Sequence, residues 1–477
     1  MKKRNLWLSA ATAVVFSAAL AGCGSTTYFA GRTLPPSGIS NRVLIAIQNP
    51  STASAGALTL VDAYYDIRSG FSGTPVAFSI SGYSGSLPIS IQNMPEEQLG
   101  AVYGSGDGSL YLINYAKESS NGTAGTLNGP SSSVFITRNQ QYVFAASQGS
   151  SVLTVVDKSA SSAGSYPLSL PGVYRVSVNP GGSTALAFVQ NSNYVYYPRK
   201  LSSGETVTYS GGSSTWPLGA VDCEPIRAPV WCLFQALDPT TSKPLTFDRP
   251  IKAIFSADGG TAYILNCGPE CGGTTASLMT LPVAPMIFLA DKYSGNLPSQ
   301  STLNNGAIAI PGGASNALID GTTMYVVGQE LMSDGYWGGH LTKVNLSAGT
   351  AGSPVSISDG SPGATSRMIE ADDDTLWIAM TKCINGERYN NSQPYGCLTM
   401  YNTSTDTVTM LEPYLGDATG VAAVTSLHKI YTAIGGQVYI YSTKDGTSID
   451  NQYVTVTGTA YDVAYMDALT DTNNTVY

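Results

Sequence analysis

The sequence is poor in charged residues and in the residues that favour helices. Charged side chains make up 12% of the 477 residues, about half of the ~25% usual in soluble domains. Glycine (51), tyrosine (29) and proline (26) are abundant by contrast. Scarce glutamate and lysine argue against helical bundles and ordinary α/β enzymes, and the turn and strand formers favour an all-β class. The hydrophobic fraction of 43% is high enough for a large core and argues against disorder.

Catalytic motifs are also scarce. The chain has 2 histidines, His340 and His428, which excludes histidine-rich metal catalysis. It has no Gly-x-Ser-x-Gly elbow, no coherent Ser/His/Asp set, and no phosphate-binding loop or dinucleotide fingerprint. The sequence therefore predicts no catalytic residue, no metal site and no cofactor, and it favours a binding protein over an enzyme.

The N-terminus has the pattern of an export signal. Three basic residues, Lys2-Lys3-Arg4, precede an apolar run from Leu6 to Leu20, which is too short for a membrane span of about 20 apolar residues. The run ends Leu20-Ala21-Gly22-Cys23, which resembles the bacterial lipobox. That resemblance implies a signal peptide over 1–22 and a lipid on Cys23, which would attach the mature chain to a membrane.

The residues after Cys23 bear on location and on partners. Gly24-Ser25 stand where an Asp favours the inner membrane in Gram-negative lipoproteins, so the resemblance implies the outer membrane. Residues 23–40 are expected to be the lipidated cysteine and a flexible Gly/Ser/Thr/Pro tether, with the folded domain over 41–477. Removing the three N-terminal cations leaves 20 basic and 32 acidic residues, a net charge of −12. This acidity argues against nucleic acid as a partner.

Six further cysteines form three local pairs. An even number of closely spaced cysteines in an exported protein favours disulfides, here Cys223–Cys232, Cys267–Cys271 and Cys383–Cys397. The Cys267-x3-Cys271 spacing leaves a zinc site as the alternative, although no histidine lies nearby in the sequence.

One pattern of short strands recurs along the chain. Its clearest copy is 133–157, in which three apolar runs are separated by turn residues; other copies centre on Val43, Leu99, Ala185, Ala262, Met324, Leu376 and Ile430. The units recur every roughly 42 to 77 residues, which includes the 40–50 residues of a four-stranded propeller blade. The pattern predicts a single all-β propeller.

The two ends of this repeat array complete each other. The first unit opens at Arg42 without an inner strand, and a lone inner-type strand, Tyr461–Met466, follows the last unit. Pairing that strand into the first blade would close the ring and remove an open sheet edge. The count is eight blades, or seven if the weak unit 87–131 is absorbed elsewhere.

The repeated aromatic-apolar strand resembles the YVTN-type repeat of bacterial surface and lactonase-like propellers. The resemblance extends over most of 41–467, and its Asn survives best in Ala262-Tyr-Ile-Leu-Asn266. It implies the propeller fold, and it leaves a lactonase-like hydrolase as an alternative function, since fold alone does not determine activity.

Aligning the repeats suggests a binding site. The inner strands are expected to begin near Arg175, Lys252, Asn316, Arg367 and Asp462. Three cations at one mouth of the channel would form an anion-accepting pocket. The alternative is that these cations pair with acids such as Asp462 or Glu370 for structural reasons.

Acidic turns and long loops give further candidates. Asp372-Asp373-Asp374 and Asp258-Gly259 are expected in strand turns, with calcium binding as the alternative. An aromatic loop carries Trp337 and His340, and the 380–398 loop carries Tyr389 and Tyr395. Such loops, and the long excursion 198–250, suit protein or glycan partners or simply cover the rim.

The sequence therefore predicts an exported, lipid-anchored β-propeller that acts as a binding or interaction module. Its expected ligands are a protein, a glycan or a small anion. In the lactonase-like alternative, residues of the channel mouth would polarise a carbonyl group.

Overall fold

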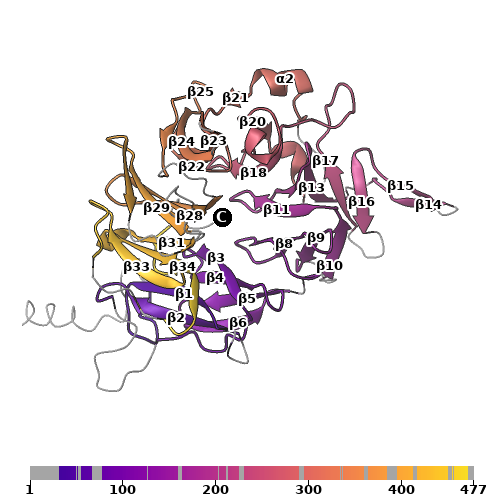
Figure 1. The fold of residues 1–477 in the computed structure, drawn as a ribbon. Coiled ribbons are helices and arrows are strands. Elements are labelled where there is room, and N and C mark those ends of the chain that lie inside the picture. Colours follow the sequence, from indigo (N-terminus) through magenta and orange to yellow (C-terminus); the bar gives the residue numbers. More distant parts are fainter. Residues whose placement is uncertain are drawn as a thin grey trace, which may run out of the picture.

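Continuously apolar runs of sequence form the second strands of the blades. All six residues of β4 (Leu99–Gly104) and of β8 (Tyr142–Ser147) are buried, as expected for strands covered on both faces. The computed structural model describes residues 32–470 except 50, 52–54, 67–77, 126, 160–163, 202–203, 211–212, 225–229, 289–294, 334, 336, 359–363, 384–394, 412–415, 450–453 and 455. Eight sheets built on such strands form a ring (Figure 1), which confirms the eight-bladed propeller.

The first four blades follow one another around the ring, and the strands of each blade are ordered from the inner strand outward. Blade 1 contains β34 (Thr459–Tyr465), β1 (Arg42–Gln48) and β2 (Gly56–Asp62). Blade 2 contains β3 (Pro88–Met94), β4, β5 (Ser109–Asn114) and β6 (Ser119–Thr123). Blade 3 contains β7 (Ser133–Ile136), β8, β9 (Val152–Asp157) and β10 (Gly164–Ser169). Blade 4 contains β11 (Val173–Val178), β12 (Ala185–Val189), β13 (Val195–Lys200), β17 (Trp231–Gln235) and β16 (Ala220–Glu224).

The other four blades have the same plan. Blade 5 contains β18 (Pro250–Phe255), β19 (Thr261–Asn266), β20 (Ser277–Pro282) and β21 (Ile308–Ala309). Blade 6 contains β22 (Asn316–Asp320), β23 (Thr323–Leu331), β24 (Trp337–Asn345), β25 (Thr350–Ala351) and β26 (Val355–Ser356). Blade 7 contains β27 (Ala364–Ala371), β28 (Thr375–Cys383), β29 (Tyr395–Asn402) and β30 (Thr407–Leu411). Blade 8 contains β31 (Ala418–Val424), β32 (Lys429–Ile434) and β33 (Gln437–Ser442).

Helices are short and lie between strands. They are η2 (Gly268–Cys271), η3 (Ala284–Met286), α2 (Gln300–Asn305) and η4 (Thr425–Leu427). Among the described residues, none of the helices has the length and apolar character needed to cross a membrane.

The ring closes between the two ends of the chain, as the sequence predicts. Strand β34 pairs antiparallel with β1, from Val43 opposite Tyr465 to Gln48 opposite Thr459. The unit 87–131 forms blade 2 and is not absorbed elsewhere, so the count is eight and not seven. Each pair of neighbouring blades encloses its own apolar cluster, so the core is distributed around the ring.

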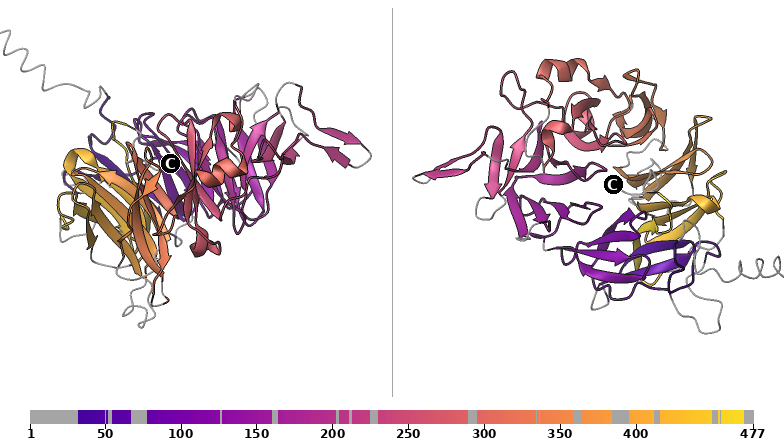
Figure 2. Two further views of the ribbon diagram at one scale, coloured as in Figure 1. Left: turned by 90° about the horizontal axis from the view of Figure 1, so that it is seen from above. Right: turned by 180° about the vertical axis from the view of Figure 1, so that it is seen from behind.

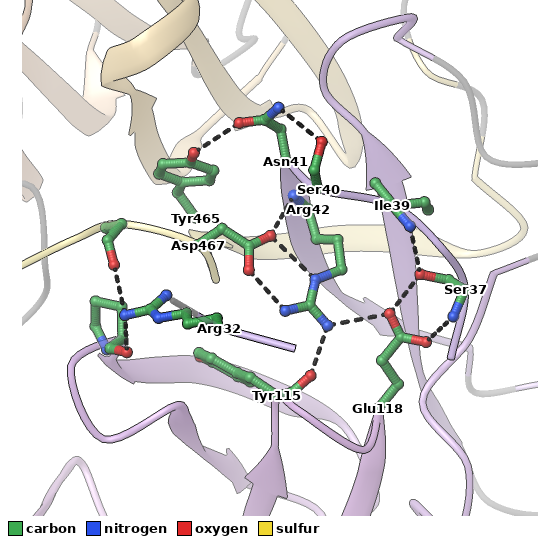
Figure 3. A network of polar contacts seen from close by, with 12 residues as sticks. Arg32, Ser37, Ile39, Ser40, Asn41, Arg42, Tyr115, Glu118, Tyr465 and Asp467 are labelled. Atoms are coloured by element: carbon green, nitrogen blue, oxygen red, sulfur yellow. Dashed lines mark hydrogen bonds and ion pairs between the residues drawn. The ribbon is translucent and has the colours of Figure 1, made fainter. Parts of the chain in front are cut away.

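A buried ion-pair network secures this closure (Figure 3). The Arg42 guanidinium donates through Nη2 to Asp467 Oδ1 at 2.6 Å and through Nη1 to Glu118 Oε1 at 3.1 Å. Its Nε also donates to Asp467 Oδ2 at 3.0 Å, and Nη1 donates to the Tyr115 carbonyl at 2.5 Å. Arg42 is 1% exposed. One cation therefore links the first strand, the second blade and the residues that follow the closing strand.

Residues 32–40 lie on the propeller, although the sequence analysis assigned them to the flexible tether. Arg32 donates through Nη2 to the carbonyls of Pro95 at 2.8 Å and Ala468 at 3.2 Å. Ser37 donates through its backbone N–H and its hydroxyl to the Glu118 carboxylate. Residues 24–31 of the predicted tether lie outside the described residues. The predicted signal peptide 1–22 and Cys23 lie outside the described residues.

The excursion 198–250 is largely part of blade 4 and not a loop over the rim. Strand β17 adds to β13, β16 adds to β17, and Trp231 is fully buried. The hairpin of β14 (Thr208–Ser210) and β15 (Ser213–Thr215) projects outward from the ring (Figure 2).

Two of the predicted disulfides are confirmed by bonded sulfur atoms. Cys223–Cys232 joins β16 to β17, and Cys267–Cys271 joins the two ends of the η2 turn. Cys397 is also disulfide-bonded, and the side chain of Cys383, its predicted partner, lies outside the described part of the chain. The zinc alternative for Cys267 and Cys271 is excluded by their bond.

Candidate functional site

A β-bulge recurs where the inner strands begin. In six inner strands one residue is left out of the pairing with the second strand: Ile89, Tyr174, Ile251, Ser366, Thr419 and Tyr461. The residue after the bulge is therefore structurally equivalent from blade to blade. Ser133 and Asn316 open β7 and β22 at the same place.

This equivalent position holds all five residues proposed for the channel mouth. Around the ring it carries Asp462, Ser90, Ser133, Arg175, Lys252, Asn316, Arg367 and Gly420. The three cations come from blades 4, 5 and 7, so only the closed ring brings them together. The bulge, which the sequence analysis did not detect, places these residues at the same position along their strands.

Two polar contacts connect four of these side chains. Lys252 Nζ donates to Asn316 Oδ1 at 2.7 Å, and Arg367 Nη2 donates to Asp462 Oδ2 at 2.7 Å. The Arg175 guanidinium lies 5.6 Å from the centroid of the Tyr174 ring, and among the described residues it has no ion pair. Among the described residues, the structural alternative that a cation pairs with a carboxylate therefore applies to Arg367 and not to Arg175 or Lys252.

The cations are close enough to affect one another. Burial first, and then the positive charges of Arg175 and Arg367, lower the pKa of Lys252 to about 7 from the usual 10.5. Both causes act in the same direction, because both make the ammonium form less favourable. Positive charge at the mouth is therefore held at a cost in free energy.

Asp462 only partly offsets this charge. Its carboxylate is fully buried and also accepts backbone N–H groups of Ile91 at 2.8 Å and Val463 at 2.9 Å. Arg367 Nε is buried and has no hydrogen-bond partner among the described residues. One donor of the cluster is thus unsatisfied even with its acid in place.

A cavity of about 210 Å³ adjoins the cluster. Most of its lining comes from five inner strands, with Arg367 and the bulge residues Ser366, Thr419 and Tyr461 among the contributors. Hydroxyl groups and a guanidinium on the wall of a cavity suit a carboxylate or phosphate group.

A second cavity, of about 340 Å³, lies between blades 4 and 5 on the same face. Glu270 of η2 and Tyr174 line it. Burial raises the pKa of Glu270 to about 7, although its Oε2 accepts the Gln329 backbone N–H at 3.1 Å, which opposes that shift. The sequence analysis missed Glu270, for which the one available signal was an acid inside a four-residue disulfide turn.

The residues predicted to contact a partner from loops are not all in loops. Trp337 and His340 belong to β24 and not to a loop, and His340 is 7% exposed with Nδ1 hydrogen-bonded to the Gly338 carbonyl. Because its ring is buried in a hairpin, His340 is poorly placed for contact with a partner. Tyr389 and the side chain of Tyr395 lie outside the described residues.

The carboxylates of the acidic turns accept hydrogen bonds from nearby protein groups. Asp373 and Asp374 adopt positive φ in the predicted turn between β27 and β28, and Asp373 accepts from Thr443 and from the exposed His428. Asp258 accepts from Ser256 and from the Gly260 N–H. Within the described part of the chain no cluster of three or more His, Cys, Asp or Glu residues could hold a metal ion. These contacts fit turn chemistry, and nothing described supports the calcium alternative.

Comparison with known proteins gives no family. No family model and no curated protein sequence matches the chain, so the YVTN-type resemblance stays an interpretation of the sequence.

Solved structures resemble the chain only distantly. A hydrazine synthase from Kuenenia stuttgartiensis is 14% identical with a TM-score of 0.44, over 72% of this chain and 94% of the other. A dihydro-heme d1 dehydrogenase is 10% identical with a TM-score of 0.47, over 91% and 79%. A putative 6-phosphogluconolactonase from Bacteroides uniformis is 10% identical with a TM-score of 0.44, over 89% and 99%. Similarity of this size carries no argument about activity.

Proposed function

We propose that this protein is an exported, lipid-anchored binding module that takes a small anion at the mouth of its channel. The anion would carry a carboxylate or a phosphate group. The observation that supports the proposal is that Arg175, Lys252 and Arg367 hold one equivalent position on the inner strands of three blades, where the Asp462 carboxylate pairs with Arg367.

The energetics of the cluster favour an anion. Like charges in a partly desolvated site repel each other strongly, because water screens them poorly there. A bound anion would remove that repulsion and pair with guanidinium groups whose planar geometry matches two oxygens of a carboxylate or phosphate. A cluster of three cations is also unusual in a chain whose net charge is −9.

Anion binding should be coupled to proton uptake. Because the neighbouring positive charges depress the pKa of Lys252 to about 7, a bound negative charge should raise that pKa again. Near neutral pH the protein should then take up part of a proton for each anion bound. Calorimetric titrations in buffers of different ionisation enthalpy measure this uptake.

The test is a double variant, Arg175→Ala with Arg367→Ala, titrated with phosphate, pyruvate and lactate. Hydrogen bonds to charged groups contribute about 1.5–3 kcal/mol each, so the double variant should bind at least about a hundredfold more weakly. The matched control is Arg138→Ala, which removes an arginine that lies 3.7 Å from Glu96 at the surface. Unchanged binding in the double variant, or no binding of any of these anions to the unaltered protein, contradicts the proposal.

A further inference from the structure

The second cavity, between blades 4 and 5, is lined by one cation and one anion that do not pair. Arg249 and Glu270 both contribute to the wall of this volume of about 340 Å³. Among the described residues, no ion pair joins them to each other or joins either of them to a third residue. Both side chains are partly exposed. Two opposite charges on the wall of one cavity are therefore available to a ligand.

Arg249 is held in place by contacts that use only some of its donors. Its Nε donates to the Gly272 carbonyl at 3.4 Å, and its Nη1 donates to the Asn191 carbonyl. A guanidinium has five N–H donors in one plane, and Nη2 makes no hydrogen bond to a described residue. The side chain is thus fixed while part of its planar fork can still donate to a carboxylate.

Glu270 is also held through part of its hydrogen-bonding capacity. It belongs to the η2 turn, whose two ends are joined by the Cys267–Cys271 disulfide. Its Oε2 accepts the Gln329 backbone N–H at 3.1 Å, whereas Oε1 accepts no hydrogen bond from a described residue. One carboxylate oxygen can therefore accept from an ammonium group, which carries three donors.

The rest of the lining indicates the kind of ligand. Val189, Pro250 and Ile251 provide apolar surface, and Tyr174 adds an aromatic ring. Apolar walls with a few placed polar groups, in a volume above about 300 Å³, are typical of small-molecule sites. A ligand with a single charge would leave the opposite charge of the cavity without a partner, which is unfavourable in a partly desolvated site. The lining therefore fits a ligand with both charges and an apolar part.

We propose that this cavity binds a free amino acid with an apolar side chain, whose carboxylate pairs with Arg249 and whose ammonium group pairs with Glu270. The ligand's side chain would lie against Val189, Pro250 and Ile251. This site is separate from the anion site at the channel mouth, because the two cavities share no lining residue. It does not rest on the proposed function, and it adds a second class of ligand.

The experiment is calorimetric titration of the purified full-length protein with three ligands of one carbon skeleton. Leucine carries both charges, isocaproate lacks the ammonium group, and isoamylamine lacks the carboxylate. Because a hydrogen bond between charged groups changes affinity by at least about tenfold, leucine should bind at least about tenfold more tightly than either analogue.

Two variants assign each charge of the ligand to one residue. Glu270→Gln keeps the shape of the side chain but removes its negative charge, so the preference for leucine over isocaproate should be lost. Arg249→Met keeps the aliphatic part but removes the guanidinium, so the preference for leucine over isoamylamine should be lost. Since each variant is judged by a ratio of two ligands, a smaller folded fraction does not imitate the result. The matched controls are Glu96→Gln and Arg138→Met, at a surface pair separated by 3.7 Å, and both should keep the two preferences.

The pH dependence of leucine binding gives a further check. Burial raises the pKa of Glu270 to about 7, so the affinity should rise from about pH 6 to about pH 7.5 as the carboxylate ionises. Among the other lining residues, an arginine stays charged in this range, and Tyr174, whose pKa burial raises to about 12, stays neutral. The rise should be absent in Glu270→Gln and in the binding of isocaproate.

The outcomes distinguish this site from the channel mouth. If leucine binds no more tightly than its analogues, or if Glu270→Gln keeps the preference for leucine, the proposal is wrong. Arg367→Ala, in the other cavity, should leave leucine binding unchanged. If Arg367→Ala weakens leucine binding and Arg249→Met does not, leucine binds at the mouth, which contradicts the amino-acid site and leaves the anion site standing.

Discussion

The charged groups at the closure of the ring and at the channel mouth differ in how many of their cations have carboxylate partners. At the closure of the ring, Arg42 is matched by two carboxylates, Asp467 and Glu118, and all three residues are at most 7% exposed. At the channel mouth, Arg367 is the one of the three cations that pairs with a carboxylate among the described residues, and this carboxylate, on Asp462, also accepts two backbone N–H groups. In the first group every charged side chain has a partner of opposite sign, with one negative charge in excess, whereas the second group leaves positive charge without a carboxylate partner among the described residues.

The difference separates structural charge from charge available for a ligand. A buried pair whose members all have partners contributes to a unique closed state, and removing one member leaves an uncompensated charge. A cluster that repels itself lowers stability, so its presence suggests a purpose other than folding. Three substitutions test this distinction at the two locations.

The largest effect is expected from Arg42→Met. This change leaves the carboxylates of Asp467 and Glu118 buried without their cation, which typically costs about 3–5 kcal/mol. Because the network joins the two ends of the chain, the ring should open at blade 1 before the other blades unfold. Chemical denaturation measures the loss, and hydrogen exchange should show β1 and β34 losing protection first. A loss below about 1 kcal/mol would mean that Arg42 does not hold the closure.

The fold was predictable because its signal is repeated. Short apolar strands with turn residues recur, and the missing inner strand at Arg42 together with the extra strand at Tyr461 predicted the closure that the structure shows. The Arg42 network was not predictable, since Asp467 is 425 residues away and the two partners belong to no motif. The excursion 198–250 was misjudged because its strands β16 and β17 extend blade 4 and have no counterpart in the other repeats.

The candidate site was predictable in part for the same reason. Aligning the repeats brought Arg175, Lys252 and Arg367 to one position, which is the residue after the bulge. Sequence alone could not show which cation has an acid partner, because partners lie on neighbouring blades. His340 was placed in a loop because Gly338 and Gly339 suggested one, whereas both lie within the long strand β24.

An intermediate effect is expected from Asp462→Asn, in opposite directions for folding and binding. The new amide N–H groups would face donors from Arg367 and Ile91, so stability should fall by about 1–3 kcal/mol. Loss of this acid, which is the one paired with a mouth cation among the described residues, should at the same time tighten anion binding, because a negative charge that competes with the ligand is removed. Thermal denaturation and calorimetric titration with phosphate measure the two effects. Asp445→Asn, in a surface turn, controls for removal of an acid; weaker binding in Asp462→Asn would show that the acid orients Arg367 for the ligand.

The smallest effect is expected from Lys252→Met. This change should raise the free energy of unfolding, whereas Arg42→Met should lower it. Burial and the two arginines lower the pKa of Lys252 to about 7 in the folded protein, against about 10.4 for a free lysine. Between these values the unfolded chain binds more protons, so this group makes the free energy of unfolding rise with pH. Below pH 7 both states are protonated and the full cost of the desolvated charge is present.

Removing the amine should therefore stabilise the protein at pH 6–7, by about 1–2 kcal/mol after allowing for screening by water. The advantage should shrink as the pH approaches 10, because the amine of the unaltered protein is by then neutral when folded. Urea denaturation from pH 6 to pH 10 measures this, with Lys343→Met as the control for substituting a lysine by methionine. If Lys252→Met instead loses stability at every pH, as Arg42→Met should, the positive charge at the mouth has a structural role and the contrast between the two locations disappears.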